Sequence, residues 1–211
     1  LCKTLTGLGA TYGEIKAKRN SIIVEPNVST IQCKCADPKH ANDNLYRVIE
    51  KVGVDDIKEY IVNTKDKYYK FLVTPESFYK VKEAFKELEL SVYNECFMLF
   101  DESHKLVKDA DYREGIYLPL DDFFQFKGKA LVSATPVELS DPRFKDFQKL
   151  VIEPQFDFHV NIEIQCTNNT LERFKQTINN LQSNCICIFL NSTDTIHALM
   201  EKIGILDEST V

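Results

Sequence analysis

The chain has 211 residues, a formal net charge of −6, 44% hydrophobic residues and 27% charged residues. This length and composition suit one large globular domain, or one domain with part of a second. No apolar run approaches the roughly 20 residues that span a bilayer, and no secretory signal is visible, so we expect no membrane contact and a cytoplasmic location. The acidic balance weighs against binding nucleic acid through a broad basic face.

Apolar, β-rich runs alternate along the chain with segments of helical spacing. The runs fall at 21–24, 71–73, 96–100, 130–133 and 186–190, and the helical segments at 42–51, 77–89, 171–181 and 193–203. We place a helix and then an edge strand within 53–69, and extended chain at 151–166. Because the apolar runs lack clean polar alternation, they predict strands of a parallel sheet that is buried on both faces. The alternation predicts an α/β fold.

Two glycines separated by one residue, and followed by a threonine, lie near the start of the chain. This segment consists of Thr6, Gly7, Leu8, Gly9, Ala10 and Thr11. Backbone N–H groups of such a turn can face a phosphate chain, and a helix that begins near Thr11 would point its positive end at the same anion. The segment therefore predicts a phosphate-binding loop.

An apolar strand at 97–100 runs directly into an acidic segment. That segment consists of Asp101, Glu102, Ser103 and His104. A buried strand that ends in two carboxylates brings both charges to the edge of a sheet. There Asp101 could hold a hydrated Mg²⁺ ion and Glu102 could polarise a water for attack on a phosphate. Many strands also end in acidic residues by chance, so for this segment alone both interpretations stay open.

A second short apolar strand, 130–132, ends in Ser133, Ala134 and Thr135. In their order along the chain, the glycine segment, the acidic segment and this one resemble motifs I, II and III of the superfamily 2 helicases of the DEAD/DEAH-box type. Residues 21–27 and 70–77 resemble the intervening motifs Ia and Ib, each a strand that runs into a proline. The resemblance covers about residues 4–192.

The resemblance implies a RecA-like P-loop lobe over residues 1–155, a three-layer αβα structure with a mainly parallel sheet. Residues 156–211 would form a linker and the beginning of a second RecA-like lobe, with the motif IV region. The implied cofactors are ATP and Mg²⁺. The implied activity is movement on nucleic acid, and of DNA and RNA we expect the partner to be DNA. Residues 6–11 would bind the phosphates, and Thr11 and Asp101 would bind the metal.

The same resemblance assigns the catalytic roles. Asp101, Glu102 and His104 would be catalytic, with Glu102 orienting the attacking water. His104 would communicate with Ser133 and Thr135, which couple hydrolysis to closure of the lobes. Ser133 and Thr135 could instead simply cap the turn that follows them. Between motifs II and III, residues 105–128 would hold a helix and a loop.

Position 10 departs from the family pattern, because the family has lysine where this chain has Ala10. A methyl group offers the phosphates neither a charge nor a hydrogen-bond donor, so we expect weak nucleotide binding or slow hydrolysis. The substitution could be engineered, or it could be natural with a cation supplied from elsewhere. Lys3, Lys16 and Lys18 flank the loop. The domain could also be a degenerate ATPase that is kept for binding alone.

Nothing in the chain resembles motif VI, so we expect a piece of a longer protein that is inactive alone. A catalytically inactive RecA-like binding or assembly module is therefore the alternative function. A P-loop kinase or GTPase fits poorly, because it explains neither residues 133–135 nor the start of a second lobe. The cysteine pairs Cys33/Cys35 and Cys185/Cys187 lack the spacing of common zinc sites, and we expect reduced thiols.

Overall fold

The structure is a computed structural model. It describes residues 2–3, 9–64, 67–105, 115, 119–135, 137, 139, 141–153, 166–180 and 193–203. The chain divides into two compact units, Leu1–Asp157 and Phe158–Val211, which are described separately. The division lies two residues from the expected lobe boundary. Whether the second unit begins a RecA-like lobe stays a prediction.

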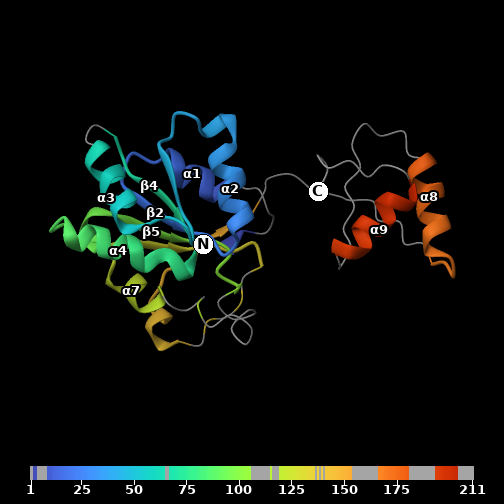
Figure 1. Ribbon diagram of the computed structural model, residues 1–211. Coiled ribbons are helices and arrows are strands. Elements are labelled where there is room, and N and C mark those ends of the chain that lie inside the picture. The colour runs from blue at the N-terminus through green and yellow to red at the C-terminus, as the bar shows by residue number, and fades with distance from the viewer. Residues whose placement is uncertain are drawn as a thin grey trace. The chain divides into compact units, whose positions relative to one another are not determined.

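Strands and helices alternate through the first unit (Figure 1). The strands are β1 (Cys2–Lys3), β2 (Ser21–Val24), β3 (Leu45–Val48), β4 (Lys70–Val73), β5 (Phe97–Phe100), β6 (Gly128–Leu131) and β7 (Val151–Ile152). The α-helices are α1 (Ala10–Lys16), α2 (Val28–Ala36), α3 (Val54–Asn63), α4 (Phe78–Glu87), α5 (Val92–Glu95) and α7 (Leu120–Gln125). Short 3₁₀ helices occur at Pro38–His40, Pro75–Ser77 and Pro142–Phe144.

Five of these strands form an all-parallel sheet in the order β3-β4-β2-β5-β6. β1 and β7 form a separate parallel pair. The strands expected at 21–24, 71–73, 96–100 and 130–133 are therefore confirmed, with shifts of one or two residues at their ends. The run at 186–190 lies outside the described residues.

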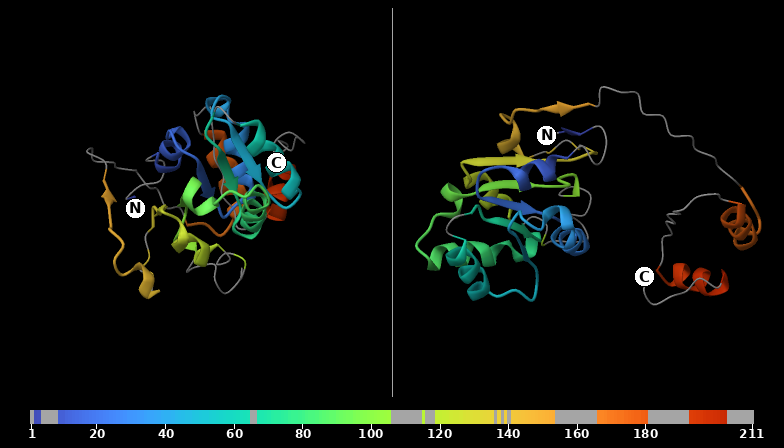
Figure 2. Two further views of the ribbon diagram at one scale, coloured as in Figure 1. Left: turned by 90° about the vertical axis from the view of Figure 1, so that its left-hand side faces the viewer. Right: turned by 90° about the horizontal axis from the view of Figure 1, so that it is seen from above.

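Helices cover both faces of the five-stranded sheet, as the absence of polar alternation in its strands predicts (Figures 1 and 2). Ile22 and Val24 of β2 belong to the core that contains the buried side chains of α3, α4 and α7. Ile23 points to the other face and packs with Ile15 of α1 and Ile31 of α2. The first unit is thus an α/β domain compatible with a three-layer fold.

The apolar stripe of α4 lies in the core, as its helical spacing predicts: Phe78, Val81 and Phe85 are buried. The helix expected early in 53–69 is confirmed as α3. Within 105–128 the structure describes α7, and within 151–166 it describes β7.

The expectation of a helix at 42–51 is wrong, because Leu45–Val48 is the edge strand β3. Asn44 has φ 55°, in the left-handed region, which prevents a helix from running through it. Tyr46 stacks on Tyr60 of α3 with the ring centroids 4.4 Å apart, so tertiary packing favours the extended form. The edge strand β3 precedes α3, and the described residues that follow α3 within 53–69, which are 64 and 67–69, contain no strand.

In the second unit, the helices expected at 171–181 and 193–203 are confirmed as α8 (Thr170–Asn180) and α9 (Thr193–Ile203). Among the described residues of both units, no helix is long and apolar enough to cross a membrane.

Candidate functional site

The carboxyl ends of the central strands lie together at one edge of the five-stranded sheet. Val24 pairs with Phe100, and Phe100 pairs with Leu131, so β2, β5 and β6 end at the same level. The residues that follow β2 and β5 are Glu25 and Asp101, which are only 1% and 4% exposed. This edge therefore holds two carboxylates in an environment from which water is largely excluded.

Thr11 of α1 reaches the same edge, where its hydroxyl donates a hydrogen bond to Oδ2 of Asp101. Gly9 immediately precedes α1 and has φ 80°, a conformation that favours glycine. Thr11 and Asp101, to which the resemblance assigns one metal ion, are thus in contact at this edge of the sheet. Thr6, Gly7 and Leu8 lie outside the described residues.

The second carboxylate of the acidic segment points away from the core. Glu102 has φ 49°, and its backbone N–H donates to Oδ1 of Asp101 at 2.9 Å. Its side chain is 32% exposed and lies 3.2 Å from His104, between Oε2 and Nδ1. The turn after β5 thus presents one buried carboxylate and one that water can reach.

The acidic segment contacts the segment after β6 directly. His104 Nδ1 lies 3.0 Å from Oγ of the buried Ser133, and the Thr135 N–H donates to the same Oγ at 3.1 Å. The backbone N–H of Ser103 also donates to the carbonyl of Val132 at 2.9 Å. His104 therefore contacts Ser133 directly and is linked to Thr135 only through it, and Ser133 also stabilises the turn that follows it.

A lysine that the sequence did not indicate lies at this edge. Lys34 of α2 forms an ion pair with Glu25, and its Nζ is 3.7 Å from Oδ2 of Asp101. The pKa of Glu25 is raised to about 7, mainly by burial; Lys34 opposes this shift, and the charges of Asp101 and Glu102 contribute to it. No motif marks Lys34, because its place depends on how α2 packs.

Unlike Lys34, the described lysines that flank the glycine loop in the sequence form no ion pair with Asp101. Lys16 forms a salt bridge with Asp43 at 2.7 Å, and Lys18 is exposed. The side chain of Lys3 lies outside the described part of the structure. The ammonium of Lys16 is therefore paired with the loop that follows the 3₁₀ helix Pro38–His40.

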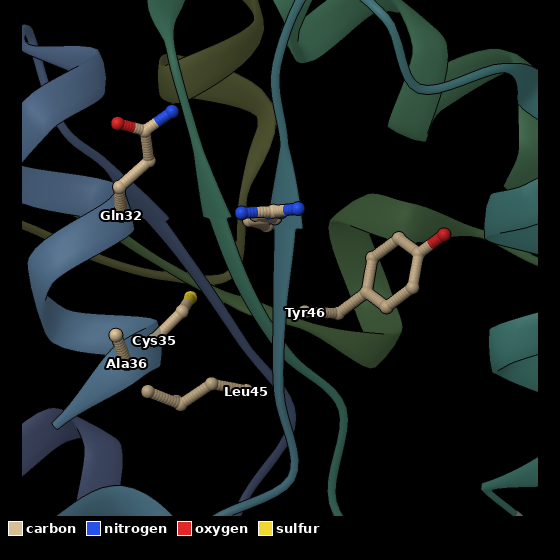
Figure 3. Close-up of a pocket in the computed structure, with 6 residues that line it drawn as sticks. Gln32, Cys35, Ala36, Leu45 and Tyr46 are labelled. Atoms are coloured by element: carbon tan, nitrogen blue, oxygen red, sulfur yellow. The ribbon is translucent and has the colours of Figure 1, made fainter.

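One open pocket of about 360 Å³ lies beside the sheet edge formed by β3 (Figure 3). It is lined by Gln32, Cys35 and Ala36 from α2 and by Leu45, Tyr46 and Arg47 from β3. None of the residues predicted to be functional lines it. Cys33 and Cys35 are free thiols. Cys185 and Cys187 lie outside the described residues.

A comparison of the chain with protein-family models and with curated proteins gave no match.

Proposed function

We propose that this chain is the ATP-binding part of the motor core of a superfamily 2 nucleic-acid helicase or translocase, with a RecA-like P-loop fold. The observation that supports this best is the hydrogen bond from Thr11 to Asp101, which joins residues 90 positions apart. These are the two residues to which the family resemblance assigns the same magnesium ion. Chance similarity of two short segments gives no reason for them to touch.

The donor set fits magnesium. Mg²⁺ prefers oxygen ligands and is held in many nucleotide sites by one or two protein groups together with phosphates and water. The hydroxyl of Thr11 and the carboxylate of Asp101 meet this requirement. Among the described residues, no group of three or more His, Cys, Asp or Glu side chains offers a metal site made of protein ligands alone. When bound, magnesium would polarise the terminal phosphate of ATP.

In this proposal, the partly exposed carboxylate of Glu102 orients the attacking water, since water can reach it and Asp101 is buried. His104 contacts both Glu102 and Ser133, so a shift of the acidic segment moves the segment at 133–135. The proposal includes a nucleic-acid partner, DNA in preference to RNA, and a location in the cytoplasm, and for these it depends on the family resemblance.

Ala10 favours a second candidate, a RecA-like module that binds nucleotide or a partner without hydrolysis. The loop lacks the lysine ammonium that would stabilise the negative charge on the phosphates in the transition state of hydrolysis. The two candidates differ in turnover, while both predict binding of the magnesium–ATP complex.

Titration calorimetry with MgATP tests the part that both share. Asp101→Asn should weaken binding at least tenfold in Mg²⁺ and much less in EDTA, because it removes a charged metal ligand. Asp55→Asn is the matched control, since Asp55 is 93% exposed on α3. Undetectable MgATP binding by the wild type and by its Ala10→Lys variant would refute the proposal.

Because the chain alone is expected to be inactive, ATP turnover is measured in the full-length protein, with and without single-stranded DNA, and this separates the two candidates. Turnover that DNA stimulates and that Glu102→Gln abolishes, with MgATP binding retained, supports the motor. Binding without any turnover, even in Ala10→Lys, supports the binding module.

A further inference from the structure

Lys34, on α2 and outside the glycine loop, brings a positive charge to the carboxyl edge of the sheet. The Lys34 ammonium lies 3.7 Å from Oδ2 of Asp101, and this is the oxygen that accepts the hydrogen bond from Thr11. The same ammonium is paired with Glu25, which follows β2. Lys34 therefore lies beside the two groups to which the proposed function assigns the metal, although it is far from them in sequence.

The position of Lys34 is fixed by the packing of α2. Ile31, one turn earlier on the same side of the helix, is fully buried against the sheet. This contact directs Lys34 toward the sheet edge, where its side chain stays 25% exposed. A partly exposed lysine on a flexible four-carbon stem can shift its ammonium by a few ångströms without any backbone change.

We propose that Lys34 supplies to the phosphates of a bound nucleoside di- or triphosphate the positive charge that Ala10 does not provide. This inference rests on the proposed function. Glu25 holds the ammonium in place before binding, and phosphate oxygens that arrive beside Thr11 take over part of its hydrogen bonding. An ammonium on phosphate oxygens makes charge-assisted hydrogen bonds, which are the strong kind.

A purely structural lysine is the competing interpretation. The buried carboxylates of Glu25 and Asp101 lie close together, and a neighbouring cation stabilises the fold whether or not a ligand binds. Such a lysine would affect folding but would not distinguish nucleotides by their number of phosphates. Phosphate selectivity is therefore the quantity to measure.

The experiment measures the dissociation constants of ATP, ADP and AMP by titration calorimetry, in Mg²⁺ at constant ionic strength. Lys34→Met should weaken ATP and ADP about tenfold or more, as expected for the loss of one charge-assisted contact, and AMP by less than threefold. Adding Ala10→Lys to Lys34→Met should restore ATP binding. Lys18→Met, which removes an exposed lysine just beyond the end of α1, should leave all three constants unchanged.

Because Lys34→Met leaves Glu25 buried without its cation, a second variant combines Lys34→Met with Glu25→Gln, and circular dichroism compares the fold of each variant with the wild type. Equal ATP binding by the wild type and a folded Lys34 variant would overturn the inference and leave the proposed function standing. So would a loss that is the same for AMP as for ATP. If ATP binds only after Ala10→Lys, Lys34 is not the substitute. If no variant binds ATP, both proposals fail.

Discussion

Lys70 connects helix α1 to the sheet, and its removal should change how stability depends on pH. Its ammonium is buried, with 3% of the residue exposed, and Nζ donates to the carbonyls of Glu14 and Ala17 at 2.8 Å each and to Oγ of Ser21 at 3.0 Å. These carbonyls lie at the end of α1, where a cation is favourable. The contacts hold in place the helix that carries Thr11.

Burial lowers the pKa of Lys70 from 10.5 to about 8. In the unfolded chain the ammonium keeps its proton up to its ordinary pKa, so between pH 8 and 10.5 the unfolded state binds more protons than the folded state. The stabilisation linked to this group is therefore complete above pH 10.5 and is lost as the pH falls through 8. Between pH 7 and 9.5 it amounts to about 2 kcal/mol.

The perturbation is Lys70→Met, which keeps most of the length of the side chain and removes the titrating group. We expect the free-energy difference between wild type and variant to grow by about 2 kcal/mol from pH 7 to 9.5. Urea unfolding followed by tyrosine fluorescence measures it. All nine tyrosines lie between residues 12 and 117 and the chain has no tryptophan, so the signal reports the first unit alone.

Lys18→Met serves as the control, because Lys18 is exposed and should give a difference that does not depend on pH. Stability curves for the wild type and Lys70→Met that stay parallel from pH 7 to 9.5 would refute the reasoning. That result would mean that the buried lysine keeps the ordinary pKa of a solvated one.

Two further substitutions test contacts at and near the candidate site by the same unfolding assay. Ser133→Ala removes the hydroxyl that contacts both His104 and the Thr135 N–H and should cost about 1–2 kcal/mol; an unchanged stability would mean that these contacts contribute nothing. In Gly128→Ala, a Cβ would lie 2.8 Å from Cδ2 of Phe97 on β5, so overpacking should cost about 1–3 kcal/mol. Gly13→Ala is its control, since that Cβ meets nothing within 4 Å and the helix should gain up to about 1 kcal/mol; equal effects of the two would contradict the steric explanation.

Elements that local pattern controls could be predicted from the sequence. The strand 97–100 is apolar throughout because both of its faces are covered, and the acidic residue that ends it must then lie at the carboxyl edge. Asp101 was located in this way. The contact of Thr11 with Asp101 was also predictable, but only through the order of the family motifs, since nothing local links residues 90 positions apart.

Elements that depend on tertiary contacts were not predictable in the same way. In β3, Leu45, Val48 and Ile49 have the spacing of a helix, but pairing with β4 and the packing of Tyr46 on α3 favour a strand. Lys34 belongs to a short helix of low amphipathicity, and its approach to Asp101 depends on how Ile31 docks. Neither contact leaves a periodic signal in the chain.

Lys70 and Lys34 show why a charge cannot be assigned from its place in a motif. Lys70 donates to two carbonyls and a hydroxyl, which satisfies its three N–H bonds within the protein, so it has no donor left for a ligand. Lys34 is instead paired with carboxylates, is partly exposed, and lies where phosphates are expected. A site requires a positive charge at a point in space, and a neighbouring helix can supply it as well as the loop can. The alanine at position 10 therefore does not by itself exclude nucleotide binding.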